Sequence, residues 1–242
     1  MRIAFTALTA AAALAFAPTP ASAQTQDAPT APERLQSGDV EGGKARANGA
    51  IDRRLVTIER LETRVSDHPH VTDPHQRELL DELGRASAGL RALSADIAQA
   101  TTIEELRDLV PKIATDFRVY LVVARKVHQV LGSDSVVAAG TRLEKMSESL
   151  AGRIDRAVEN GVDASEAAAH LADMTAEFGQ ALAVGEPDAG TVLPLTAADW
   201  PDPAAAVLAQ GRADLGDARR FLREARISFS EAVAPLREAL GS

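Results

Sequence analysis

The sequence contains no cysteine, one tryptophan and one tyrosine among 242 residues. The absence of thiols excludes a disulfide framework, a cysteine nucleophile and a lipid anchor on cysteine. Because aromatic residues make up only 3%, the chain offers almost no stacking platforms for bases or sugars. The formal net charge of −9 also disfavours nucleic acid and anionic lipid surfaces as partners.

Recognised catalytic and cofactor motifs are missing as well. The sequence has no HExxH, no glycine-rich phosphate loop and no GxSxG. Its carboxylates are scattered, as expected for charges on helix surfaces. We therefore assign no catalytic residues, infer no cofactor, and expect a protein that is not an enzyme.

The first 23 residues have the features of a signal peptide. Arg2 supplies a positive start, residues 3–17 form an apolar run, and Ala21, Ser22 and Ala23 make a small-residue cleavage site. No later stretch reaches the roughly 20 uncharged residues that a membrane span needs, so we predict no membrane insertion. We expect export and a secreted, extracytoplasmic location, with a flexible leader over 24–43.

Residues 102–131 show the strongest helical pattern in the chain. Their apolar residues recur at alternating steps of four and three, which places them on one stripe of a long helix. Thr102 and Glu105 have the spacing of a capping box at its start. Pro111 predicts a kink over 107–111 or a short separate helix, because proline removes a backbone hydrogen bond. The stripe consists of Leu106, Val110, Ile113, Phe117, Tyr120, Ala124, Val127 and Leu131.

Comparable stripes predict helices on both sides of this segment. Gly132 is a candidate C-terminal cap, with the next helix beginning at Ser133 or Ser135. The glycines and prolines of 185–200 predict a long loop before the last helix. The pattern predicts an all-α fold, an elongated antiparallel bundle of five or six long helices over 44–242. The first helix is expected to begin between residues 41 and 47 and to end near residue 66. The remaining helices are expected near 74–98, 135–160, 163–184 and 203–240.

A histidine-rich loop between the first two helices is the densest polar cluster. His68, His70 and His75 lie beside Asp67 and Asp73, and imidazole with carboxylate suits Zn, Cu or Ni. The loop lacks the fixed i, i+4 spacing of specific metal motifs. A helix connection, with Asp73 as the N-cap residue, is therefore the favoured interpretation.

Two apolar groups are candidates for a partner or ligand surface. Phe117 and Tyr120 could line a pocket, although aromatic residues at helical spacing more often fill a core. Leu193, Leu195 and Trp200 could form an exposed lip that binds a partner, or fold back over one end of the bundle, which we favour.

Three segments resemble a known group of proteins. They are DFRVYLVVARKVHQV, IDRRLVTIERL before it and LTAADW after it. Together they are similar to exported all-helical proteins of high-GC Gram-positive bacteria that lack an assigned function. The resemblance covers most of the chain after residue 23. It implies secretion and an all-α fold, and no catalytic residues.

These observations leave two classes of function. The favoured class is a structural or protein-interaction role, with a cell-envelope protein or a second copy of the chain as partner. The alternative is an extracytoplasmic carrier of an apolar ligand or a metal ion. The histidine loop and the Phe117–Tyr120 segment are the candidate sites for such a carrier.

Overall fold

The computed structural model describes residues 39–241, and their side chains up to residue 238. The expected signal peptide over 1–23 and the leader up to residue 38 lie outside the described residues. Helix α1 already begins at Val40, inside the expected leader, because the Asp39 carboxylate caps it by accepting from the Gly42 amide at 2.8 Å.

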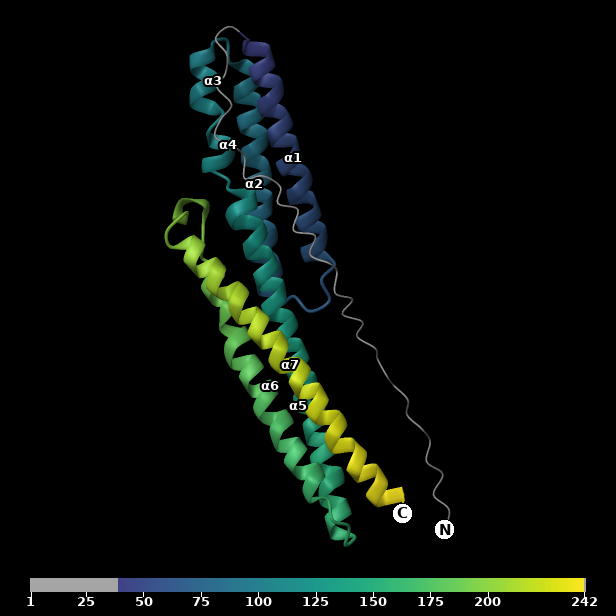
Figure 1. The fold of residues 1–242 in the computed structure, drawn as a ribbon. Helices are drawn as coiled ribbons and strands as arrows, with labels where there is room; N and C mark the ends of the chain where they lie inside the picture. The colour runs from purple at the N-terminus through teal and green to yellow at the C-terminus, as the bar shows by residue number, and fades with distance from the viewer. Residues whose placement is uncertain (1–38, 242) are drawn as a thin grey trace. The chain divides into compact units, whose positions relative to one another are not determined.

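The described chain is all-α, and its five long helices pack antiparallel to one another (Figure 1). No β-strand occurs between residues 39 and 241. The predicted fold class is therefore confirmed. The long helices are α1 (Val40–Ser66), α2 (Asp73–Gln99), α5 (Ala124–Glu159), α6 (Ser165–Val192) and α7 (Ala204–Gly241). The short segments are α3 (Ile103–Leu109), α4 (Lys112–Thr115), the π-helical η1 (Val119–Val123) and the 3₁₀-helical η2 (Ala197–Asp199).

Apolar stripes hold these helices together. Helix α1 packs on α2, with α3, α4 and η1 against α1, while α5 packs on α6 and α7 (Figure 1). Each stripe is removed from water, which is the main stabilising contribution in such a bundle. The first pair buries Ile51, Ile58, Val65, Leu79, Leu83, Leu90 and Ile97, and the second group buries Val136, Leu143, Met174, Phe178, Leu215 and Leu222.

The segment 102–131 is not one continuous helix. The capping box of Thr102 and Glu105 is confirmed, and Pro111 ends α3 early, so the expected short separate helix is present. The chain then breaks before η1, where Arg118 adopts the left-handed conformation with φ 39°. This break interrupts the predicted stripe, so Tyr120 is 37% exposed and Val122 is buried in its place.

Helix α5 runs through Gly132, so the predicted helix end at this position is wrong. A Cβ atom at Gly132 would lie 2.8 Å from the Leu215 side chain on α7. Glycine is required here because two helices approach closely, and not because the chain turns.

The predicted loop over 185–200 is also wrong in its first half, because α6 continues to Val192. A Cβ atom at Gly185 would lie 2.7 Å from Val136 on α5, so this glycine again marks a close helix contact. Pro187 lies inside the helix and removes one amide donor. Nearby, the Ser133 hydroxyl donates to the Gly185 carbonyl at 2.7 Å, which fastens this part of α6 to α5.

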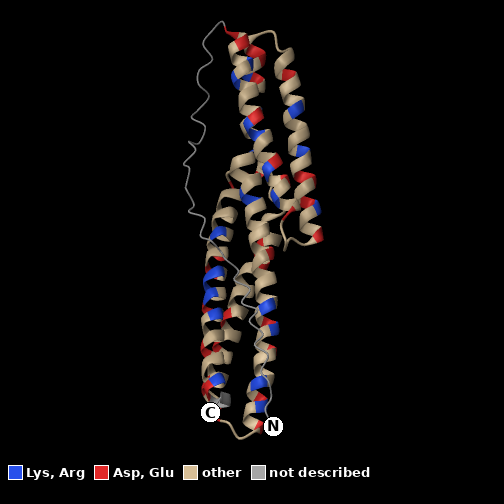
Figure 2. Ribbon diagram, turned by 90° about the vertical axis from the view of Figure 1, so that its right-hand side faces the viewer, with Lys and Arg blue, Asp and Glu red and all other residues tan. Residues whose placement is uncertain are grey.

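Charged residues of both signs are interspersed along the helices (Figure 2). This mixture is typical of helix faces in contact with solvent. None of the described helices combines the length and apolar character that a membrane span requires.

Candidate functional site

An open cavity of about 410 Å³ lies between α2, the residues before η1, the start of α5 and the segment after α6. Its volume is within the range of small-molecule sites. Three of the five predicted surface residues, Phe117, Leu193 and Leu195, meet here. We term it the α2–α5 cleft, and it is lined by Glu78, Glu82, Arg85, Ala86, Asp116, Phe117, Val123, Lys126, Leu193, Pro194, Leu195, Thr196 and Ala197.

The most unusual group in this lining is a buried lysine. Lys126 is 2% exposed, and its ammonium lies 2.7 Å from the Glu82 carboxylate on α2. It also donates to the carbonyls of Leu193, at 3.1 Å, and of Leu195. All three of its N–H groups therefore have acceptors, as a buried charge requires. Lys126 fixes the segment after α6 to both α5 and α2.

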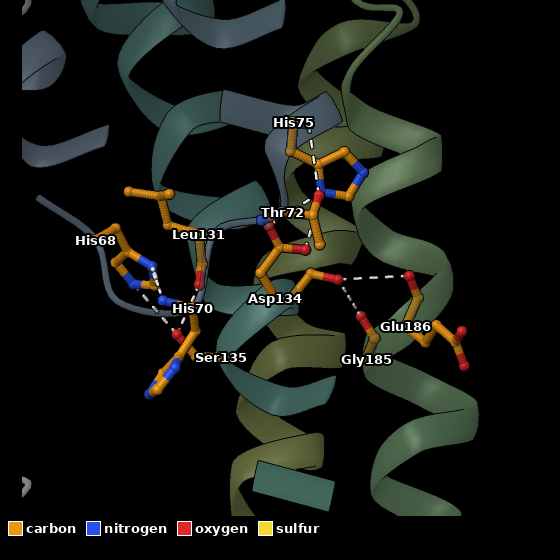
Figure 3. Close-up of polar contacts among 10 residues, drawn as sticks. His68, His70, Thr72, His75, Leu131, Asp134, Ser135, Gly185 and Glu186 are labelled. Atoms are coloured by element: carbon orange, nitrogen blue, oxygen red, sulfur yellow. Dashed lines mark hydrogen bonds and ion pairs between the residues drawn. The ribbon is translucent and has the colours of Figure 1, made fainter. Parts of the chain in front are cut away.

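Lys126 belongs to a polar stripe on α5 that continues with Gln129 and Ser133. The spacing of three and four residues places these side chains on one helix face. All three are buried. Gln129 donates to the Leu208 carbonyl on α7, and Ser133 donates to the carbonyls of Gly185 and Glu186, which are labelled in Figure 3. One face of α5 thus holds the backbone on both sides of the segment that links α6 to α7.

Irregular backbone lies beside the cleft, where Arg118 follows the lining residue Phe117. Arg118 keeps a left-handed conformation that costs about 1–2 kcal/mol in a non-glycine residue. Its Nε donates to the Ala197 carbonyl at 2.9 Å. The preceding Phe117 ring packs on Gly89 of α2, where a Cβ atom would lie 2.5 Å from the ring. Strained backbone and π-helical turns are frequent at functional sites. Both occur beside the cleft, at Arg118 and in η1.

The lining of the cleft combines one hydroxyl, five charged side chains and several apolar groups. It contains no histidine, and its single hydroxyl, on Thr196, is hydrogen-bonded to Asp199 at 2.8 Å. This hydroxyl belongs to the capping box at the start of η2. Apolar groups such as Val123 and Leu195 are combined with exposed charges at the rim, including Arg85.

The other two predicted surface residues do not line the cleft. Tyr120, on η1, lies beneath the guanidinium of Arg54, 5.2 Å from the ring centre. Trp200 is half-buried, with Arg125 at 5.7 Å from its ring. Both aromatic residues are therefore involved in cation–π contacts at the surface.

Of the three histidines considered as metal ligands, His75 contacts a different part of the bundle from His68 and His70, whose rings lie 6.1 Å apart. His75 lies 2.8 Å from Asp134, a buried carboxylate on α5 that also accepts from the Thr72 amide at 3.0 Å (Figure 3). Thr72, and not Asp73, is the N-cap residue of α2. Asp134 thereby ties the start of α2 to α5.

His68 and His70 contact other groups of the bundle. The Nδ1 atom of His68 accepts from the His70 amide at 3.4 Å, so its Nε2–H donates to Ser135, at 3.3 Å (Figure 3). Burial and the neighbouring His70 and Arg64 lower the pKa of His68, which favours this neutral form. Arg142 is 3.4 Å from the His70 ring. Across residues 39–241, no three His, Asp or Glu side chains are grouped to hold a metal ion.

A second buried polar site lies between α5, α6 and α7. Asp188 is 5% exposed and Gln129 is 7% exposed, yet Asp188 Oδ2 and Gln129 Oε1 have no hydrogen-bond partner. Burial, and then the negative charge of Asp214, raise the pKa of Asp188 to about 6. Sequence reasoning missed this group because it placed Asp188 in a loop.

The comparisons with known proteins add no family and no relative. No protein-family model, no curated protein and no solved structure matches this chain. Function is therefore inferred from the geometry of the cleft.

Proposed function

We propose that this chain is an exported, non-catalytic binding protein that holds a small ligand with an apolar body in the α2–α5 cleft. Export is supported by the signal-peptide features of residues 1–23. A binding role is supported by a cavity of about 410 Å³ whose wall is held by a buried ion pair. This cavity is the single observation on which the proposal depends.

Two energetically unfavourable features in and beside this wall support a binding role. A simple helical bundle needs neither a buried lysine nor a left-handed arginine, because apolar packing alone closes such folds. Here Lys126 and Arg118 both hold carbonyls of the segment 193–197 in place. A fixed wall is what ligand binding requires, since a preformed pocket reduces the entropy lost on binding.

A structural or protein-interaction role is the second candidate, and one observation favours it. Tyr120 and Trp200 each present an aromatic ring with an arginine over its face near the surface. Tyrosine, tryptophan and arginine are the residues enriched at the energetic centres of protein interfaces. A cell-envelope protein or a second copy of the chain would be the partner.

Binding of the neutral apolar dye Nile red tests the proposal. The dye should bind the protein with its fluorescence enhanced, because the cleft removes it from water. Ala86→Trp fills the cleft from its α2 side and should abolish the enhancement. Ala88→Trp is the matched control, since Ala88 is exposed on the same helix and outside the lining.

The comparison of these two variants decides the result. Equal dye binding by Ala86→Trp and the unchanged protein would overturn the proposal, because the dye would then be bound elsewhere. Loss of binding in both tryptophan variants would do the same, since the effect would not be specific to the cleft. Circular dichroism of both variants verifies that the helices are intact.

A further inference from the structure

Acceptor oxygens of Asp188 and Gln129 lie near the same position in the interface between α5, α6 and α7. A Cβ atom at Gly211 of α7 would lie 2.0 Å from Asp188 Oδ1 and 3.1 Å from Gln129 Oε1. The amide orientation of Gln129 is fixed because its Nε2 donates to the Leu208 carbonyl. Its oxygen is therefore the atom that faces Asp188. An ionised Asp188 would leave its Oδ2 atom and the nearby Gln129 Oε1 atom buried with no donor, which is costly.

A proton on Asp188 supplies the missing donor. Because oxygens of both side chains lie near the same position beside Gly211, the O–H of a protonated Asp188 is placed to donate to Gln129 Oε1 and so to link α6 to α5. No cation is among the described groups that shift the pKa of Asp188. On α5, Gln129 and Ser133 are uncharged, and on α7 the charged group acting on Asp188 is the Asp214 carboxylate, which accepts from Gln210 at 2.8 Å. Negative charge from Asp214 also favours the protonated form.

This site is connected directly to the wall of the cleft. Asp188 lies in the last turns of α6, which ends at Val192. The carbonyl of the next residue, Leu193, accepts a hydrogen bond from the Lys126 ammonium. Gln129 lies one turn after Lys126 on the same face of α5. The end of α6 therefore positions two of the three acceptors of Lys126, the carbonyls of Leu193 and Leu195.

We propose that Asp188 and Gln129 form a proton-binding site that fixes the end of α6, so that the α2–α5 cleft holds its ligand more tightly in acid than in alkali. The inference rests on the proposed function, because it describes the regulation of the same cleft. Protonation adds the O–H···O bond between the two side chains. Loss of the proton to solvent places an unpaired negative charge in the interface and loosens the segment that Lys126 holds.

The test measures the affinity for Nile red at about pH 5 and about pH 8, on either side of the expected proton release. The dissociation constant of the unchanged protein should rise by at least about fivefold with pH. Asp188→Asn should show no such rise, because the asparagine amide donates at every pH. Asp173→Asn, at an exposed position of α6, is the matched control and should behave like the unchanged protein.

Thermal unfolding of the same proteins tests the proton site without ligand. Between the ordinary carboxyl pKa and the raised one, the folded state binds more protons than the unfolded state, so raising the pH lowers the free energy of unfolding. The melting temperature should therefore fall from about pH 4 to about pH 6 in the unchanged protein, relative to Asp188→Asn.

The two measurements separate the two proposals. A dye affinity that is equal at both pH values would overturn the coupling between the proton site and the cleft. Identical melting profiles of the unchanged protein and Asp188→Asn would overturn the proton site itself. Absence of dye binding at either pH would contradict the proposed function, and the melting profiles would still decide whether Asp188 holds the proton.

Discussion

The ammonium of Lys126 lies 2.7 Å from the carboxylate of Glu82, and this ion pair joins α5 to α2 at the base of the cleft. Lys126 is 2% exposed, so its charge is stabilised by the protein and not by water. The same ammonium also donates hydrogen bonds to two backbone carbonyls, of Leu193 and Leu195, in the segment after α6. One side chain thus connects α5 and α2 to the segment after α6 that lines the cleft.

Replacement of Lys126 should therefore be costly. Lys126→Met keeps the length of the side chain but leaves the Glu82 charge and two carbonyls without their donor. We expect it to lower the free energy of unfolding by about 3 kcal/mol, as measured by urea denaturation. Lys145→Met, at an exposed position of α5, is the control and should change it by less than about 0.5 kcal/mol. Equal effects of the two substitutions would contradict the role assigned to Lys126.

Arg118 offers a separate test of the irregular backbone beside the cleft. Arg118→Gly and Arg118→Ala both remove the hydrogen bond to the Ala197 carbonyl, so they differ only in how well they tolerate φ 39°. The glycine variant should be more stable than the alanine variant by about 1 kcal/mol in urea denaturation. An alanine variant as stable as the glycine variant would show that the backbone at 118 is not left-handed.

Two glycines of α6 should respond to alanine with opposite signs. Gly185→Ala would bring a methyl group to 2.7 Å from Val136, so we expect a loss of about 1–3 kcal/mol in the free energy of unfolding. Gly179→Ala meets no atom within 4 Å and should gain about 0.5–1 kcal/mol from the better helix propensity. Urea denaturation measures both. A gain for Gly185→Ala would mean that α6 does not approach α5 at this point.

The sequence predicted the parts of the fold that depend on simple periodicity. The apolar stripe of α2, with Leu79, Leu83 and Leu90, is buried. Side chains at helical spacing share one face of the helix, and an apolar face packs against a neighbouring helix. The capping box of Thr102 and Glu105 is local chemistry and was also correct. The break at Arg118 was missed, since a left-handed arginine has no local sequence signal.

Glycine and buried polar residues account for the other differences. Gly132 and Gly185 were interpreted as turn residues, because a sequence does not distinguish a glycine that ends a helix from one that admits a neighbouring helix. Phe117 and Leu195 were each predicted as surface candidates, but their meeting in one cleft depends on tertiary packing. No feature of the sequence indicated that Lys126 is buried, since a lysine beside an apolar stripe is usually solvated.

The most direct test of the binding role is native mass spectrometry of the protein isolated from its own host without added dye or metal. We predict an intact mass above that of the polypeptide, with the excess released on collisional activation and absent in Ala86→Trp. Ala88→Trp should retain the excess mass. A bare polypeptide mass for the unchanged protein, or the same bound mass in Ala86→Trp, would contradict the assignment of the α2–α5 cleft as a ligand site.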